Sequence, residues 1–139
     1  MTEGTVQLIL DASALTAYGR NPAVGELLTE IESEAALVVF STGSLAQAAA
    51  EDADRALLEL LLQRDSCESI SPMIEWEAFG DFLRRLGHRR DAHDAFLVFL
   101  AFLHRAYILT GDPDRYTVIH KAVQCIPLQR PWSDGDELQ

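Results

Sequence analysis

The fold is decided by the sequence Asp-Ala-His-Asp-Ala-Phe at positions 91–96, which continues as an apolar segment to Leu103 and is followed by Tyr-Ile-Leu-Thr-Gly-Asp-Pro-Asp at positions 107–114. Because its apolar residues are nearly continuous, the first segment predicts a helix over 91–105 that is buried on most sides. The second segment predicts a short strand over 107–110 with carboxylates at its end. Acids on a buried helix and at the end of the next strand are an arrangement that gathers carboxylates around a metal ion.

Strands and helices alternate in the rest of the chain. Apolar or extended segments predict strands at 6–10, 36–40, 67–71 and 123–128. Helical periodicity and capping residues predict helices over 14–18, 22–31 and 73–86. Two further helices are predicted to begin near residues 44 and 54. Ser44 and Gln47 have the spacing of a capping box, and Trp76 and Phe79 fall on the core-facing stripe of the helix over 73–86.

This alternation indicates an α/β fold. We expect a single domain over 1–130, with a mainly parallel central sheet of four to five short strands flanked by helices. Residues 131–139 form a polar, acidic C-terminal tail, to which we assign no structure.

Composition limits the classes of protein that the chain can represent. Its 139 residues, 48% of them hydrophobic, suffice for one domain with a core. The formal net charge of -11 argues against a protein that coats nucleic acid by bulk attraction, so any nucleic-acid contact must be local. The two cysteines lack paired spacing, which suits a reducing cytosol, and the longest apolar run is about half of a membrane span. We therefore expect a soluble, cytoplasmic protein.

Two segments carry residues whose role the sequence leaves open. The cations Arg84, Arg85, Arg89 and Arg90 precede Asp91 closely. They either contact the phosphates of a nucleic acid or merely complement a helix C-terminus and solvate a loop. The leucines within 57–62 cover more of a helix than one core-facing stripe needs, so they either pack between neighbouring helices or form a dimer or partner surface.

Three acids occupy similar places in the expected fold. Asp11 follows the first strand, Asp94 lies in the first turn of the buried helix, and Asp112 follows a later strand, with Asp114 as a fourth candidate. Carboxylates that meet at one edge of a sheet repel one another unless they share a proton or a cation, and hard oxygen ligands select Mg²⁺ or Mn²⁺. The alternative is that Asp11 and Asp94 only cap helices.

A known family shows the same motifs in the same order. Leu-Ile-Leu-Asp-Ala-Ser-Ala-Leu at 8–15, the segment at 91–96, and Tyr-Ile-Leu-Thr-Gly-Asp-Pro-Asp-Arg-Tyr at 107–116 together resemble PIN-domain proteins, most closely the VapC-type ribonuclease toxins of toxin–antitoxin systems. The resemblance covers nearly the whole chain. It implies a PIN-like domain that cleaves RNA with Mg²⁺ or Mn²⁺, forms a homodimer and is held inactive by a cognate antitoxin.

The resemblance also assigns roles to individual residues. Asp11, Asp94 and Asp112 match the family's first, third and fourth acids, which are catalytic and bind the metal. Asp114 matches an additional acid, and Ser13 matches a hydroxyl residue that helps to hold the water of the site.

The family's second acid is where the chain departs. The family has a pattern resembling Thr-Leu-Ala-Glu, whereas positions 44–47 read Ser-Leu-Ala-Gln. Gln47 still offers a carbonyl oxygen but removes one negative charge, and Glu51 follows one helical turn later, about 5–6 Å along the same face. Two functions therefore stay open: a metal-dependent endoribonuclease, or a catalytically weakened or inactive PIN-like module that binds RNA or a protein.

Overall fold

The computed structural model describes residues 5–51, 53–71, 75–86 and 91–128. The predicted tail at 131–139 lies outside the described residues. The same holds for Arg89 and Arg90, two of the four cations proposed to contact RNA.

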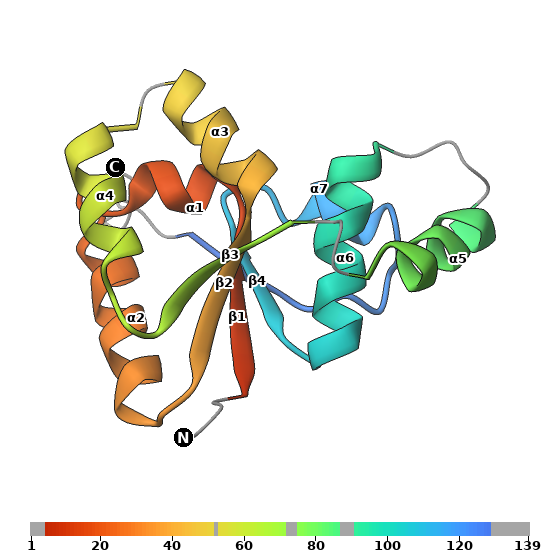
Figure 1. Ribbon diagram of the computed structural model, residues 1–139, viewed down its shortest axis with the longest axis horizontal. Coiled ribbons are helices and arrows are strands. Elements are labelled where there is room, and N and C mark those ends of the chain that lie inside the picture. Colours follow the sequence, from red (N-terminus) through yellow and green to blue (C-terminus); the bar gives the residue numbers. More distant parts are fainter. Residues whose placement is uncertain (1–4, 52, 72–74, 87–90, 129–139) are drawn as a thin grey trace, which may run out of the picture.

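A parallel sheet forms the centre of the molecule (Figure 1). Its order is β3-β2-β1-β4-β5, and every neighbouring pair is parallel. The five strands are β1 (Val6–Leu10), β2 (Leu37–Ser41), β3 (Cys67–Ile70), β4 (Tyr107–Thr110) and β5 (Cys125–Pro127). This arrangement confirms the predicted α/β fold with a mainly parallel sheet.

Helices cover both faces of the sheet (Figure 1). α1, α2 and α4 lie on one side, α5, α6 and α7 lie on the other, and α3 lies above the end of the strands, beside α1. The seven helices of the described residues are α1 (Ala12–Ala17), α2 (Pro22–Ser33), α3 (Thr42–Ala50), α4 (Arg55–Leu62), α5 (Trp76–Leu86), α6 (Ala92–His104) and α7 (Asp114–Thr117). None of these helices has the length and apolar character that crossing a lipid bilayer requires.

The central strand supplies both halves of the core. Successive side chains of a strand point to opposite faces, so Leu8 and Leu10 join the cluster under α1, α2 and α4, while Ile9 joins the cluster under α6. All three are at most 1% exposed. A strand buried on both faces reads as a continuous apolar run, which is why β1 could be placed from the sequence.

The segment around Asp94 forms the predicted buried helix. In α6, every residue from Asp94 to Ala101 is buried. The sheet covers one side of this helix, and α5 covers the other through Phe79, whose ring centroid lies 5.1 Å from that of Phe96 and 5.4 Å from that of Phe99. Burial on both sides explains why its apolar residues are nearly continuous.

Two local predictions are wrong. α3 begins at Thr42 with Ser41 as its N-cap, so the predicted capping box of Ser44 and Gln47 does not exist. The hydroxyl of Ser41 accepts a hydrogen bond from the backbone N–H of Ser44, which leaves Ser44 inside the helix. Trp76 is 64% exposed, because it opens α5, and the helix first reaches the core at Phe79.

The leucines of α4 divide into two sets. Leu58 and Leu61 are buried, whereas Leu60 and Leu62 are 54% and 43% exposed. Packing inside one chain therefore accounts for only part of the apolar surface. The predicted contact of this helix with a second subunit or an antitoxin stays a prediction.

Candidate functional site

The three predicted acids line one cavity of about 120 Å³. Asp11 follows β1 and caps α1, Asp94 lies in the first turn of α6, and Asp112 follows β4. Parallel strands bring these positions to one edge of the sheet, which is where ligands bind in open α/β sheets. The complete lining is Asp11, Ala12, Ser13, Gln47, Glu51, His93, Asp94, Asp112, Arg115 and Tyr116.

Asp11 is held by hydrogen bonds on both carboxylate oxygens. Its Oδ1 accepts from the Ser13 hydroxyl at 2.6 Å and from the backbone N–H of Ala14 at 3.0 Å. Its Oδ2 accepts from the Tyr116 hydroxyl at 2.8 Å. The residue is 4% exposed, so it caps the helix and presents a fixed carboxylate to the cavity at the same time.

Ser13 joins two loops that meet at the cavity. Its hydroxyl donates to Asp11 and accepts from the backbone N–H of Gly111 at 2.9 Å. The next residue, Asp112, donates its backbone N–H to the hydroxyl of Thr110 at 3.0 Å. The loop that carries Asp112 is therefore fixed to the loop that carries Asp11, although Asp112 itself is exposed.

Asp94 is a buried acid in which only one of the two carboxylate oxygens accepts a hydrogen bond from a described residue. Its side chain is 10% exposed, and its Oδ2 accepts from Nε of Arg115 at 2.7 Å. Its Oδ1 is buried and has no hydrogen-bond partner within the described part of the chain. The hydrogen bond to Asp94 raises the pKa of Arg115, so this guanidinium stays charged and balances one acid of the cavity.

His93 lies between Asp94 and the start of α3. Its Nε2 is 2.8 Å from the hydroxyl of Ser41 and 3.1 Å from that of Ser44, and its Nδ1 is 3.8 Å from Oδ1 of Asp94. Gly43 provides the space for the ring, because a Cβ at Gly43 would lie 2.9 Å from Cδ2 of His93. The position of the imidazole is therefore fixed from two sides.

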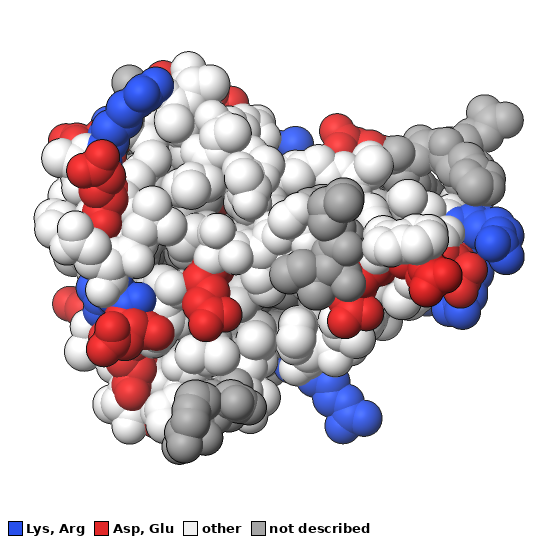
Figure 2. All heavy atoms as spheres, viewed as in Figure 1, with Lys and Arg blue, Asp and Glu red and all other residues white. Residues whose placement is uncertain are grey.

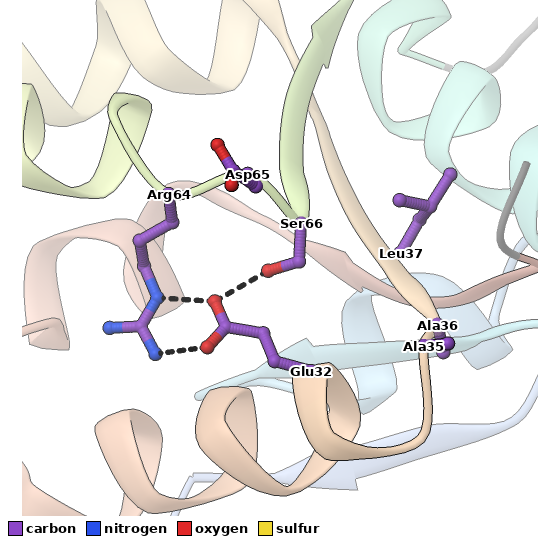
Figure 3. A pocket seen from close by; sticks show the side chains of 7 residues that line it. All are labelled: Glu32, Ala35, Ala36, Leu37, Arg64, Asp65 and Ser66. Carbon is purple, nitrogen blue, oxygen red and sulfur yellow. Dashed lines mark hydrogen bonds and ion pairs between the residues drawn. The ribbon is translucent and has the colours of Figure 1, made fainter. Parts of the chain in front are cut away.

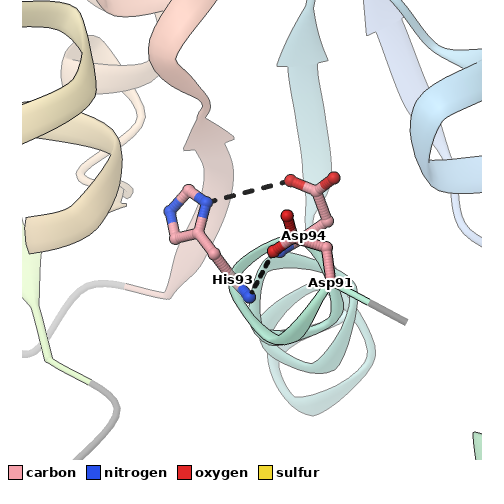
Figure 4. Close-up of side chains that lie close together, drawn as sticks. All are labelled: Asp91, His93 and Asp94. Atoms are coloured by element: carbon pink, nitrogen blue, oxygen red, sulfur yellow. Dashed lines mark hydrogen bonds and ion pairs between the residues drawn. The ribbon is translucent and has the colours of Figure 1, made fainter. Parts of the chain in front are cut away.

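Asp91, His93 and Asp94 form a compact group that could hold a metal ion (Figure 4). One ligand atom of each lies within 4.8 Å of the others. Oδ1 of Asp91 also accepts the backbone N–H groups of His93 and Asp94, which makes Asp91 the N-cap of α6. The predicted set of Asp11, Asp94 and Asp112 shares the cavity, but among the described residues it does not form a group of this compactness.

Gln47 and Glu51 reach the cavity from α3. The side-chain amide of Gln47 donates to Oε2 of Glu51 at 3.2 Å. Gln47 is half-buried and Glu51 is exposed. Both line the same cavity as Asp11 and Asp94.

Three predicted residues lie elsewhere. Asp114 is exposed at the first position of α7 and does not line the cavity. Arg84 and Arg85 lie on α5, and Arg84 pairs with Asp81 at 3.3 Å. Figure 2 shows basic and acidic side chains side by side at that end of the molecule. Neither arginine lines the cavity.

Sequence reasoning missed three residues whose polar side chains line the cavity: His93, Arg115 and Tyr116. Burial raises the pKa of Tyr116 well above its usual value, and the charge of Asp11 adds to the effect, so the phenol keeps its proton and donates a hydrogen bond to Asp11. All three lie within the quoted motifs. Their partners are up to 105 positions away in the sequence, and no local pattern indicates such contacts.

A larger pocket, of about 520 Å³, lies at the opposite edge of the sheet, where β2 and β3 begin (Figure 3). There Arg64 donates hydrogen bonds to the carboxylate of Glu32 from Nε at 2.7 Å and from Nη2 at 3.0 Å, and the hydroxyl of Ser66 donates to Glu32 at 2.6 Å. These bonds lower the pKa of Glu32. Because Arg64 and Glu32 neutralise each other, we interpret this pocket as the site of a structural ion pair that links α2 to the loop after α4.

No family model matches the chain, and a search of curated proteins finds no significant match.

Proposed function

We propose that the protein is a metal-dependent endoribonuclease of the PIN-domain type, which hydrolyses RNA phosphodiester bonds in the cavity of Asp94. The observation that supports this most is the state of Asp94 itself. It is a buried carboxylate with one oxygen lacking a partner among the described residues, in the same cavity as Asp11 and Asp112. Such an oxygen is costly to bury unless a cation binds it.

The donor set fits Mg²⁺ or Mn²⁺. Carboxylate oxygens are the ligands that these ions prefer, and Asp11, Asp94 and Asp112 would hold the ion, with Asp114 as a less direct contributor. When bound, the ion supplies stabilisation of the phosphodiester's negative charge and lowers the pKa of a coordinated water. Gln47 and Glu51 line the same cavity and offer further oxygens.

The neighbouring side chains keep these acids in place. Tyr116 and Ser13 each donate a hydrogen bond to Asp11, and Arg115 orients Asp94. Arg115 is 41% exposed, so its guanidinium can also meet an RNA phosphate at the mouth of the cavity. Because the protein is strongly acidic, contacts with RNA depend on such local cations, and Arg84 and Arg85 stay candidates for a more distant one.

Cleavage of a labelled RNA tests the proposal. Wild-type protein should cleave a fluorescently labelled single-stranded RNA in Mn²⁺ or Mg²⁺ and leave it intact in EDTA. Asp94→Asn keeps the shape of the side chain and removes its charge. Because loss of a residue that only orients a ligand costs 10–100-fold, loss of the ligand itself should lower the rate at least about 100-fold.

The matched control is Asp81→Asn, which removes an exposed acid on α5 outside the cavity. It should cleave RNA as the wild type does. Because all three proteins are purified alike, a contaminating ribonuclease would instead cleave RNA equally in all three, Asp94→Asn included. Equal cleavage by Asp94→Asn and Asp81→Asn would overturn the assignment of the site.

A second function is favoured by two observations. The site has Gln47 in place of an acid, and Arg115 already neutralises Asp94. Both weaken attraction for a cation and suit a PIN-like module that binds RNA or a protein without cutting. Gln47→Glu separates the two functions, because it should raise cleavage several-fold if the site is catalytic. In a binding module, RNA stays intact with Mn²⁺ in both proteins.

The resemblance to toxins also suggests partners. A homodimer and a cognate antitoxin in the cytoplasm would suit the exposed leucines of α4, Leu60 and Leu62. Light scattering of the purified protein measures its mass and so tests for the homodimer directly. A single monomer mass at micromolar concentration would remove the homodimer from the proposal.

A further inference from the structure

A ring nitrogen of His93 and a carboxylate oxygen of Asp94 face each other beside the cavity. Oδ1 of Asp94 is buried without a partner in the described residues, and Nδ1 of His93 lies 3.8 Å from it. Figure 4 shows this ring nitrogen pointing toward the carboxylate. The separation is too long for a hydrogen bond, so neither atom satisfies the other.

The hydroxyl groups around His93 favour one tautomer of its ring. Ser41 accepts the backbone N–H of Ser44 and donates its single hydroxyl proton to the hydroxyl of Ser44 at 2.9 Å. A proton on Nε2 suits this network, because Nε2 can then donate to the hydroxyl of Ser41 at 2.8 Å. In this tautomer Nδ1 carries a lone pair, which is directed at the free oxygen of Asp94. Metal-binding histidines are usually fixed by such a hydrogen bond from the other ring nitrogen.

The distances suit a shared cation. Two atoms that each bind one ion at about 2.1 Å lie roughly 3.0–3.5 Å apart, so 3.8 Å requires only a small adjustment. The carboxylate of Asp91 completes the group within 4.8 Å. Arg115 does not block it, because its Nε binds the other oxygen of Asp94.

We propose that His93 is a nitrogen ligand, and that His93 and Asp94, assisted by Asp91, bind a first-row transition metal ion in preference to Mg²⁺. Imidazole nitrogen binds ions of this series more strongly than it binds Mg²⁺, for which oxygen is the preferred donor. The inference rests on the proposed function for its site, and it deepens that function by selecting the class of metal. Gly43 and Ser41 are then positioning residues for the histidine.

Pulsed electron paramagnetic resonance of bound Mn²⁺ tests this directly. In wild-type protein the Mn²⁺ signal should show modulation from a coordinated ¹⁴N nucleus, and labelling histidine with ¹⁵N should change that modulation. The isotope leaves the protein chemically unaltered, so this measurement does not depend on the folding of a variant. Mn²⁺ bound without nitrogen modulation would overturn the inference and leave the endoribonuclease proposal standing.

Calorimetry with two variants provides the second measurement. His93→Gln should lower the affinity for Mn²⁺ about tenfold or more and change the affinity for Mg²⁺ far less. The matched control is His104→Gln at the other end of α6, which should bind Mn²⁺ as the wild type does. Gly43→Ala should also weaken Mn²⁺ binding, because the methyl group of the new alanine displaces the imidazole ring of His93. Equal losses of Mg²⁺ and Mn²⁺ affinity in His93→Gln, or no Mn²⁺ binding at millimolar concentration, would contradict the inference.

The two proposals fail in different experiments. A nitrogen-bound Mn²⁺ ion together with intact RNA would refute the nuclease and support the metal site. Cleavage at limiting Mn²⁺ that proceeds equally well with His93→Gln and with wild-type protein would support the nuclease and refute the role of His93.

Discussion

Replacing Tyr116 with Phe should destabilise the protein through Asp11. Tyr116 is 1% exposed, and its hydroxyl donates to Oδ2 of Asp11 at 2.8 Å. The substitution keeps the ring in the core and removes only the donor. Because Asp11 is 4% exposed, water does not readily replace that donor, and the carboxylate is left partly unsatisfied.

The expected loss follows from the charge of the acceptor. Hydrogen bonds to charged groups contribute about 1.5–3 kcal/mol, so Tyr116→Phe should lower the free energy of unfolding by about 2 kcal/mol. The effect depends on pH. Burial, with the charge of Asp11, raises the pKa of Tyr116 above its ordinary value of 10.0, so the unfolded chain loses the phenol proton first. The stabilisation is complete below pH 10.0 and falls as the pH rises further, and the Phe variant lacks this fall.

Urea unfolding followed by circular dichroism measures both effects, at pH 7 and above pH 10. The control is Tyr107→Phe, because Tyr107 is 43% exposed and its loss should change stability by less than about 0.5 kcal/mol. In Asp11→Asn protein, the cost of Tyr116→Phe should shrink, which a double-mutant cycle shows. Equal stability of the two Phe variants would refute the hydrogen bond between Tyr116 and Asp11 as a stabilising contact.

Two further predictions concern the charged pairs. Arg115→Gln removes a cation next to Asp94 and should tighten Mn²⁺ binding on the order of tenfold, because the positive charges of Arg115 and Mn²⁺ repel each other. Calorimetry measures this affinity, and weaker binding would show that Arg115 serves mainly to orient Asp94. The pKa of Glu32 is lowered mainly by its hydrogen bond with Arg64, so this pair stabilises the protein above pH 4.5 and the effect is lost as the pH falls through the lowered pKa. Glu32→Gln should therefore be less stable than wild type at pH 7, and the difference should shrink in acid unfolding measurements; a constant difference would argue against the ion pair.

The sheet could be predicted because its strands carry strong local signals. β1 and the buried half of α6 are nearly continuous apolar runs, and such runs indicate burial on both sides. Acids at the ends of β1 and β4 could then be placed at one edge from the parallel topology alone. Asp11, Asp94 and Asp112 do line one cavity, as that reasoning predicts.

Contacts between side chains distant in sequence could not be predicted. Nothing near Tyr116 indicates that its hydroxyl reaches Asp11, and nothing near His93 indicates that it meets Ser41. Such contacts depend on how α6 and α7 pack against the ends of the strands. The same limit explains why the helical stripe wrongly predicts Trp76 to be in the core: a stripe shows which face of a helix is apolar, not where the neighbouring helix begins to cover it.

A crystal grown with Mn²⁺ tests the central claim most directly, because anomalous scattering locates the ion without reference to activity. We expect one strong peak in the cavity of Asp94, within bonding distance of its Oδ1 and close to Asp11 and Asp112. A crystal with Mn²⁺ at millimolar concentration and no peak in that cavity, or with a peak only at exposed acids elsewhere, would contradict the claim that these residues form a metal site.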